Sequence, residues 1–412
     1  MDKIKIIVVG AGGRGKDYTD IMARFPEKFQ VVGVAEPIES RREFIKNLCN
    51  IPDEMCFDDY KPLLALGKIA DVALICTQDR QHFEPAMKAI ELKYDLLLEK
   101  PIAPTEEECQ KITDYANEVG VKVIICHVLR FTPFFITLKE ILDSGKIGKI
   151  INIEHLESVG NVHHSHSFTR GNWGNSEESS PMLLQKSCHD ADILQWLIGK
   201  KCKKVQSFGN LTYFKKDNAP ADSAERCMDC KYKDDCRFSA KKLYLESEDQ
   251  GWFRAACARK VEPTDEDILK ALATTRYGQC VYKCNNDVVD HQVVNMEFED
   301  DILVSFTMSS FAKSGRHIKI MGTEGSITAA FENPKISVHI HNGWKDEEID
   351  VLNPAELKGH GGGDSGIIAS LYEIMTDTYT GKSLCTIAQS NENHKIVFAA
   401  EKSRLTNTVV EL

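Results

Sequence analysis

Apolar residues in the first third of the chain alternate between two periods. Short runs rich in β-branched residues predict buried strands, at 4–9, 29–35, 71–76, 96–98 and 121–126. The stretches between them repeat apolar residues every three to four positions, which predicts helices at 39–48, 83–92 and 105–119. Strands that alternate with helices form a parallel sheet with helices on both faces. We therefore predict a doubly wound α/β domain over residues 1–125.

The pattern changes after residue 125. Further strands are predicted at 150–154, 288–298, 302–309, 318–321, 326–331 and 336–341, and helices at 181–197, 367–376 and 387–405. The strands at 288–298 and 302–309 alternate apolar and polar residues, which is typical of an antiparallel pair with one covered face. Between about 208 and 260 the periodicity dissolves into charged, cysteine-bearing sequence. We predict a second domain over 126–412 with a cysteine-rich insertion near 215–285.

A glycine-rich turn joins the first strand to the first helix. Its sequence is Gly10-Ala11-Gly12-Gly13-Arg14-Gly15. Gly10 would permit the tight turn, Gly12 would let the backbone approach a pyrophosphate, and Gly15 would let the helix pack closely on the strand. The free N–H groups of the helix N-terminus favour phosphate. The turn therefore predicts a dinucleotide site, whose candidate contacts include Gly13 and Arg14.

An acidic residue follows the second strand. A Glu36 carboxylate at that place can accept hydrogen bonds from both hydroxyls of an adenosine ribose, and it would repel a 2′-phosphate. NAD is therefore favoured over NADP. The alternative is that Glu36 is only a polar residue at a strand end. Thr77 and His82, which follow the strand at 71–76, are further candidate contacts to the cofactor.

Composition and charge narrow the class of protein. The chain has 412 residues, 42% of them hydrophobic and 27% charged, and a net charge of −11. These values are typical of a globular protein and argue against nucleic acid or an anionic membrane as partner. No secretory signal and no bilayer-spanning segment is recognisable. The 14 cysteines then favour reduced thiols or metal ligands in a cytoplasmic protein.

Two candidate acid–base groups stand out. Lys100 follows the strand at 96–98, and ligands of doubly wound sheets sit outside the carboxyl ends of the strands. A desolvated lysine there can exchange a proton with a substrate hydroxyl. The helix at 181–197 carries Gln185, His189, Asp192 and Trp196 along one face, with Lys186 beside them. Lys100 and His189 together could move a proton to or from one alcohol carbon, although exposed lysines and structural histidines are commoner.

At this point the chain resembles the Gfo/Idh/MocA family of nicotinamide-dependent sugar and polyol oxidoreductases. The resemblance covers nearly the whole chain, and four stretches carry it: the glycine turn, Glu99-Lys100-Pro101, the helix at 184–199, and Gly322-Thr323-Glu324-Gly325. It implies a Rossmann domain followed by an α/β domain with a large, mostly antiparallel open sheet. It also implies that Lys100 and His189 match the family's catalytic pair, and that Glu99 and Arg130 lie near the cofactor.

The chain departs from the family at one position. The family often has Asp four residues before the catalytic histidine, where this chain has Gln185. Because Gln cannot act as a base, proton transfer would rest on Lys100 and His189, with Lys186 nearby. Gln185 and Lys186 are then candidate contacts to substrate.

Other polar residues could line a sugar site. The loop before the helix carries His163, His164, His166, Arg170 and Trp173. Trp173 could stack on a sugar ring, and Arg170 could donate to its hydroxyls. Asp287, His291 and His360 are weaker candidates. For each of these the alternative is an ordinary polar residue of a loop or strand.

A cysteine cluster predicts a metal site. Cys227, Cys230 and Cys236 have the close spacing of zinc ligands, and a fourth thiolate would come from Cys280 or Cys284, less favourably from Cys257. A four-thiolate zinc site is closed and therefore structural. The alternatives are free thiols or a redox pair.

Three functions fit these features. The first is an NAD-dependent dehydrogenase of a sugar, polyol or related carbohydrate. The second is a glycosidase that oxidises a sugar hydroxyl, eliminates the glycosidic bond and re-reduces the sugar, with no net change in NAD. The third is a non-enzymatic nucleotide-binding scaffold. An exposed sheet face in the second domain would favour a homodimer or homotetramer.

Overall fold

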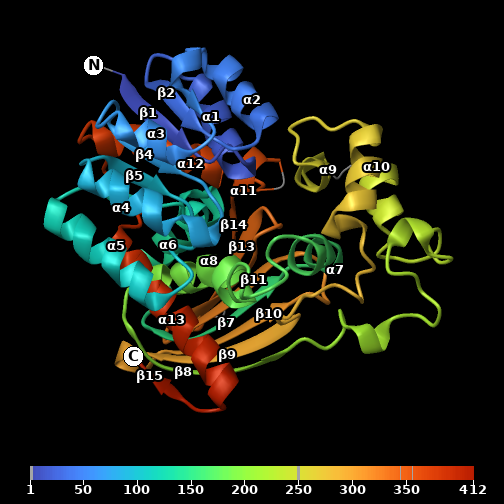
Figure 1. The fold of residues 1–412 in the computed structure, drawn as a ribbon. Helices are drawn as coiled ribbons and strands as arrows, with labels where there is room; N and C mark the ends of the chain where they lie inside the picture. The colour runs from blue at the N-terminus through green and yellow to red at the C-terminus, as the bar shows by residue number, and fades with distance from the viewer. Residues whose placement is uncertain (1–2, 248–250, 344, 355) are drawn as a thin grey trace.

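The protein is built on two sheets that lie one above the other (Figure 1). The computed structural model describes residues 3–247, 251–343, 345–354 and 356–412. The first sheet has six parallel strands in the order β3-β2-β1-β4-β5-β6. The strands are β1 (Ile4–Val9), β2 (Phe29–Ala35), β3 (Cys56–Phe57), β4 (Val72–Ile75), β5 (Asp95–Leu98) and β6 (Val123–Ile125). The predicted Rossmann architecture is confirmed.

Helices cover both faces of this sheet because its strands are apolar on both sides. Ile6 and Val8 of β1 pack with α1 (Gly13–Ala23), α2 (Glu39–Cys49) and the distant α12 (Gly363–Met375). Ile7 and Val9 face the other way, toward the remaining helices of the domain. These are α3 (Tyr60–Ala65), α4 (Phe83–Glu91) and α5 (Glu106–Val119). The helix α12, from near the end of the chain, thus completes the first domain. Sequence periodicity predicted this helix but not its position against the first sheet.

The second sheet has nine strands in the order β14-β13-β12-β11-β7-β10-β9-β8-β15. Its strands are β7 (Ile150–Ser158), β8 (Cys202–Asn210), β9 (His291–Phe298), β10 (Leu303–Ser309), β11 (Gly315–Gly322), β12 (Gly325–Ala330), β13 (Lys335–Ile340), β14 (Lys345–Asp350) and β15 (Val410–Glu411). The pair β7–β10 is parallel and the other pairs are antiparallel. The expected antiparallel pair β9–β10 and the mostly antiparallel sheet are confirmed.

Three helices separate the two sheets. They are α6 (Pro133–Asp143), α8 (Met182–Ile198) and α13 (Ile387–Thr406). Their apolar residues, such as Phe134, Leu194 and Ile396, share one core with strand residues such as Met296 and Ile320. Because α8 lies in this middle layer, the side chains on the face turned away from the second sheet point toward the first sheet. The candidate helix is therefore placed between the two domains.

The insertion is compact, although its sequence shows no periodicity. It contains α9 (Gly251–Ala258), α10 (Asp265–Thr274), the π-helical turn η7 (Lys242–Glu246) and the short 3-10 turns η5 (Lys216–Asn218), η6 (Cys227–Asp229) and η8 (Arg276–Gly278). Two small apolar cores hold it together, one around Tyr244 and Phe253 and one around Phe214 and Phe238. It packs beside α7 (Asn161–His164) and the π-helical turn η4 (Ser165–Arg170), at one end of the molecule (Figure 1).

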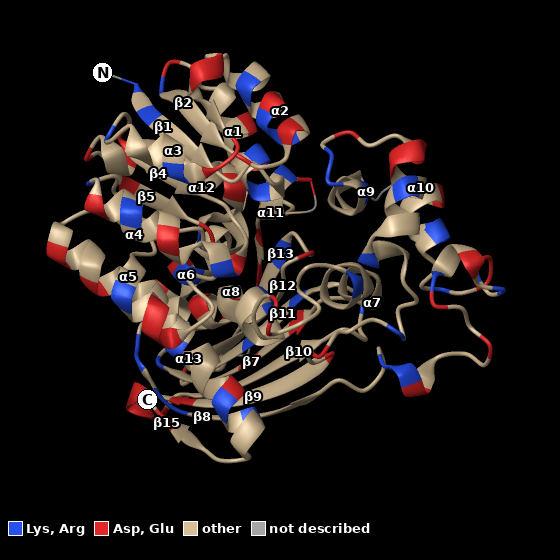
Figure 2. Ribbon diagram, in the orientation of Figure 1, with Lys and Arg blue, Asp and Glu red and all other residues tan. Residues whose placement is uncertain are grey.

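Positively and negatively charged residues are intermixed along the helices (Figure 2). Within the described residues, no helix combines the length and the apolar character needed to cross a bilayer.

Candidate active site

Lys100 and His189 come together from different domains. Lys100 follows β5 at the carboxyl edge of the first sheet, and its Nζ donates to the main-chain oxygen of Gln185, 2.8 Å away on the first turn of α8. His189 lies one turn further along α8. The hydrogen bond thus spans the domain boundary and fixes the lysine beside the helix that carries the histidine.

His189 is set up as a neutral imidazole. Its side chain is buried, and its Nδ1 has no hydrogen-bond partner. Burial lowers the pKa of His189 well below its ordinary value, and the neighbouring Lys100 and His127 lower it further. A neutral imidazole at pH 7 has a lone pair that can accept a proton, and its lowered pKa makes it a weaker base than a free imidazole.

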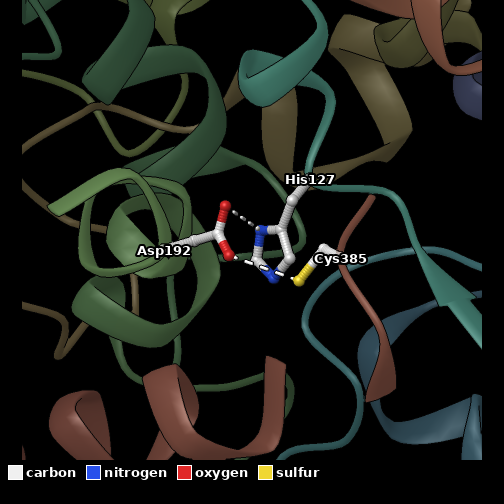
Figure 3. Close-up of side chains that lie close together, drawn as sticks. All are labelled: His127, Asp192 and Cys385. Carbon is white, nitrogen blue, oxygen red and sulfur yellow. Dashed lines mark hydrogen bonds and ion pairs between the residues drawn. The ribbon is translucent and has the colours of Figure 1, made fainter. Parts of the chain in front are cut away.

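The ring of a second histidine, His127, contacts that of His189. The His127 ring packs edge-on against His189, with centroids 5.7 Å apart at 78°. Its Nε2 lies 2.8 Å from Ser390 Oγ, and its Nδ1 lies 3.8 Å from Asp192 (Figure 3). Burial lowers the pKa of His127 to about 4, although Asp192 opposes the shift. The sequence drew no attention to His127, because it lies outside the motifs of the resemblance.

His127, Asp192 and Cys385 form the one group of potential metal ligands that converges among the described residues (Figure 3). However, Arg130 donates to both oxygens of Asp192, at 2.7 and 2.8 Å, and Asn393 donates to one of them at 2.7 Å. A carboxylate already bound by a buried guanidinium has little left to offer a cation. We interpret this group as a neutralised support for His189. Arg130 belongs to the same support, because it donates to Asp192 and to the main-chain carbonyl of Leu384.

The glycine turn leaves room for a dinucleotide. Gly10 has φ +93°, and a Cβ on it would lie 2.6 Å from the carbonyl oxygen of Cys76, the residue after β4. A Cβ on Gly15 would lie 2.1 Å from the carbonyl oxygen of Gly10. In contrast, a Cβ on Gly13 would meet nothing within 4 Å. Glu36 is buried, and its carboxylate accepts from the N–H of Ala11 at 2.7 Å. An open glycine backbone, a helix N-terminus and a carboxylate fixed beside them fit NAD.

Arg14 is bound by the protein itself. It donates to Glu99 at 2.9 Å, to both oxygens of Asp364 in α12 at 2.7 and 3.0 Å, and to the Tyr18 hydroxyl at 2.6 Å. Burial would raise the pKa of Glu99, but Arg14 and Lys100 outweigh it, and that pKa lies below its usual value. His360 Nδ1 lies 3.1 Å from the same Asp364, and its ring is 6.4 Å from His189. Arg14 thus links the glycine turn to α12 and to Glu99.

Two other predicted cofactor contacts are engaged with main chain. The ring nitrogens of His82 face the carbonyl oxygens of Pro101 at 2.8 Å and Thr77 at 3.1 Å. This leaves His82 no nitrogen for a cofactor. The Thr77 hydroxyl donates to the carbonyl of Gln81 at 2.9 Å.

Lys186 belongs to a separate charge cluster. Its Nζ lies 3.3 Å from Glu157 of β7, which also pairs with Arg316 of β11 at 2.9 Å. Arg316 in turn pairs with Asp190. Burial lowers the pKa of Lys186, although Glu157 opposes the shift. Lys186 follows Gln185, whose main-chain oxygen binds Lys100, so the two lysines approach the start of α8 from different elements.

The candidate residues of the loop contact other parts of the chain. Arg170 is completely buried and donates to the carbonyls of Phe238 and Gln279 and to Cys227 Sγ, so it holds the insertion and does not face a substrate. The Trp173 indole donates to Asp79 at 3.4 Å. The His163 ring contacts those of Trp252 and Phe168, with centroids 5.3 and 5.9 Å apart.

The remaining weak candidates are also engaged. His164 lies 2.6 Å from Ser310 Oγ, and His166 lies 2.8 Å from the Tyr244 hydroxyl. Asp287 accepts from Ser176, and His291 from β9 contacts Asp290. None of these contacts is to Lys100 or His189.

The zinc prediction gains no support. Cys227 packs in the core around Tyr244, whereas Cys236 and Cys280 belong to the core around Phe214. Cys284 donates to the carbonyl of Cys280 instead of joining the other thiols. Together with Cys230, these cysteines do not converge on one point among the described residues. The residues as arranged do not fit a four-thiolate zinc ion, and we derive no role for one.

Family models identify the protein class. A model described as the oxidoreductase family with an NAD-binding Rossmann fold matches residues 4–127, and one for the C-terminal α/β domain of that family matches residues 139–412. The chain belongs to the Gfo/Idh/MocA oxidoreductase family. It is thus an oxidoreductase with an NAD-binding domain.

Individual relatives are distant. YteT of Bacillus subtilis, named as an oxidoreductase, is 23% identical over 85% of this chain and 84% of its own length. An inositol 2-dehydrogenase of Salmonella typhimurium is 24% identical over 50% of this chain, and the match spans little more than half of that relative, 57%. The solved structure of a levoglucosan dehydrogenase with NADH and levoglucosan has a TM-score of 0.71 at 15% identity, covering 100% of this chain and 99% of that one. This similarity shows the fold alone.

Proposed function

We propose that the protein is an NAD-dependent dehydrogenase of a carbohydrate hydroxyl, in which Lys100 and His189 handle the proton. The observation that carries the proposal is the Lys100–Gln185 hydrogen bond of 2.8 Å, because it sets the lysine beside the helix of a buried, neutral His189. Relatives named as inositol and levoglucosan dehydrogenases support the substrate class.

The two residues have different tasks. In the oxidising direction the neutral His189 takes the hydroxyl proton, and Lys100 donates a hydrogen bond to the same oxygen. NAD, whose pyrophosphate the glycine turn would hold, would accept the hydride that leaves the same carbon. The substrate-facing positions proposed for Gln185 and Lys186 on α8 would hold further hydroxyls. Proton transfer then needs no acidic side chain at position 185.

One incubation tests this function. Purified protein with NAD would meet a panel of polyols, free sugars and glycosides, with reduced cofactor followed by absorbance and products by chromatography. We expect reduced cofactor to accumulate in step with a ketone or lactone. No reduced cofactor with any compound would contradict the proposal. Cleavage of a glycoside without net reduction would instead indicate the redox-neutral glycosidase, which Gln185 in place of Asp leaves open.

The preference for NAD is also a proposal. The buried Glu36 carboxylate is fixed beside the glycine turn by the Ala11 N–H, so a 2′-phosphate there would meet a negative charge. We expect NADH to bind at least about tenfold more tightly than NADPH, a difference of about 1.4 kcal/mol. Fluorescence titration of both cofactors, repeated with Glu36→Gln, would check this. Equal affinities in the unmodified protein would refute it.

Homo-oligomer formation stays a proposal with structural support. Exposed apolar residues gather on one part of the second sheet: Ile151, Phe208, Val293 and Leu303. Phe208 and Val293 are direct cross-strand neighbours. A patch of this kind favours association between copies in the cytoplasm, the compartment that the cysteine content predicts. Light scattering that gives the mass of a monomer would exclude it.

A further inference from the structure

We propose that His360 is a proton-relay residue of this site, which receives the substrate proton from His189 and passes it to solvent. The inference rests on the proposed function, because it describes how the same site releases its proton. Oxidation of a hydroxyl sends the hydride to NAD and the proton to His189. That proton must leave His189 before the next turnover, and water is its final acceptor.

His189 is poorly placed to keep this proton or to release it directly. The residue is only 7% exposed, and among the described residues its Nδ1 has no hydrogen-bond partner. An imidazolium there would lie one helical turn from the Gln185 oxygen that binds the Lys100 cation. A buried positive charge beside another one is unstable. The proton therefore needs a neighbouring acceptor.

The His360 ring lies beside that of His189. The two ring centroids are 6.4 Å apart, and the ring planes are inclined at 47°. One water molecule or one substrate hydroxyl can bridge two rings at this separation. The side chain of His360 is 44% exposed, so its ring is open to solvent. It thus connects the buried histidine to bulk water.

Asp364 orients the His360 ring. Its two oxygens lie 3.1 and 3.2 Å from His360 Nδ1, whereas Arg14 lies 3.5 Å from that nitrogen. Burial would raise the pKa of Asp364, but His360 and Arg14 outweigh it and hold that pKa below its usual value. Because an ionised carboxylate can only accept, Nδ1 of the neutral ring carries the hydrogen and Nε2 keeps its lone pair. An imidazolium on His360 would also face this carboxylate, which compensates its charge.

The backbone around His360 fixes the ring in this place. Residues 359–362 all have positive φ, and His360 itself has φ +49° and ψ +44°. Residues other than glycine seldom adopt this conformation, and such strain gathers at functional sites. A Cβ on Gly361 would lie 2.7 Å from the Phe331 ring, so the segment is closely packed. It forms α11 (Lys358–Gly361), directly beside α12 (Figure 1).

Two variants remove the ring without opposing this backbone. Asn and Gly both tolerate positive φ, so His360→Asn and His360→Gly should keep the conformation of residues 359–362. His360→Gly also leaves space that free imidazole can enter. The control is His339→Gln in β13, next to the edge strand β14. His339 is likewise partly exposed, and its Nδ1 lies 2.6 Å from the carboxylate of Asp346.

Kinetics of the NAD-loaded protein separate a relay from a structural role. The probe is the compound of the panel that the unmodified protein oxidises fastest. In dilute buffer we expect kcat to fall about tenfold in both His360 variants. The first turnover should keep its rate, because His189 can still take one proton. Free imidazole should restore most of the kcat of His360→Gly, and His339→Gln should behave as the unmodified protein.

Several results would overturn the relay alone. They are an unchanged kcat in both His360 variants, a slower first turnover, or a loss that imidazole does not restore in His360→Gly. Heteronuclear NMR of protein labelled at the histidine nitrogens tests the tautomer without substrate, with His360→Asn assigning the signal. A hydrogen on Nε2 of the neutral His360 ring would also overturn the relay. If the unmodified protein oxidises no compound of the panel, the dehydrogenase is refuted and the relay with it.

Discussion

The two halves of the proposed catalytic centre are held in different ways. Lys100 belongs to the first sheet and is surrounded by charge: its neighbour Glu99 binds Arg14, which binds Asp364. The side chain of Arg14 is 26% exposed, so water reaches this network through the guanidinium, although Glu99 and Asp364 are buried. His189 belongs to the middle layer and packs against the buried ring of His127, which lies beside a guanidinium–carboxylate pair that is almost completely buried.

This difference assigns different sensitivities to the two halves. Exposed charge networks tolerate the loss of one member, because water replaces the missing partner. Buried ion pairs do not, since removal of one partner leaves an uncompensated charge. We therefore expect substitutions around Lys100 to change mainly activity. Substitutions around His189 should change both activity and stability.

The largest effect should come from the two proposed catalytic residues. Lys100→Met and His189→Gln each remove a group that exchanges or positions a proton, so we expect kcat to fall by about 10²–10⁴-fold. The affinity for NADH should change little, because neither side chain belongs to the glycine turn. Stopped-flow kinetics and fluorescence titration measure the two quantities. Turnover that persists in Lys100→Met would remove Lys100 from the chemistry.

The next test compares the two supporting carboxylates. Asp192→Ala leaves Arg130 buried without its partner and should lower the free energy of unfolding by about 3–5 kcal/mol. Asp364→Ala leaves the partly exposed Arg14 with Glu99 and water, so we expect a smaller loss of about 1–3 kcal/mol. Urea unfolding of both variants measures the difference. Equal losses would mean that the two networks are not held as differently as their burial indicates.

Much of this centre follows from local sequence. The glycine turn, Lys100 after a strand, and the spacing of Gln185 and His189 on one helix face are all patterns within a single strand–turn–helix unit or helix. Such patterns fix which residues lie at the carboxyl edge of a parallel sheet. The Rossmann fold and the mostly antiparallel second sheet were predictable for the same reason.

The rest depends on contacts between distant segments. Asp364 and His360 reach the first domain from the end of the chain, and no periodicity connects them to Arg14. The insertion buries widely spaced aromatic residues such as Phe253, so its apolar content follows neither helix nor strand period. The cysteine spacing predicted zinc, but Cys227 and Cys236 are drawn into separate cores. Spacing alone does not reveal such a divergence.

Acid should weaken the histidine half selectively. Burial lowers the pKa of His127 to about 4, below the value of about 6.5 in an unfolded chain. The unfolded state then binds the proton more readily than the folded state. The contribution of His127 to the free energy of unfolding is therefore complete above about pH 6.5 and is lost as the pH drops toward 4. The loss attributable to His127 is on the order of 3 kcal/mol.

Unfolding curves between pH 7 and pH 4.5 measure this loss. His127→Leu should show a shallower fall than the unmodified protein, whereas His317→Gln, a change at an exposed histidine of β11, should show the same fall as the unmodified protein. Other buried histidines keep some pH dependence in both variants; burial also lowers the pKa of His394, to about 3. Identical slopes for His127→Leu and the unmodified protein would show that His127 does not contribute.

The smallest effect should separate the side chain of Gln185 from its backbone. Lys100 binds the main-chain oxygen of Gln185, so Gln185→Ala keeps the lysine in place and removes only a candidate contact to substrate. We expect KM to rise about tenfold, equivalent to about 1.4 kcal/mol, with kcat nearly unchanged. Ser187→Ala, on the same helix but facing the core beside Met296, should change neither constant. A large fall in kcat for Gln185→Ala would instead place this amide in the proton-transfer step, and the two halves would then share a third group.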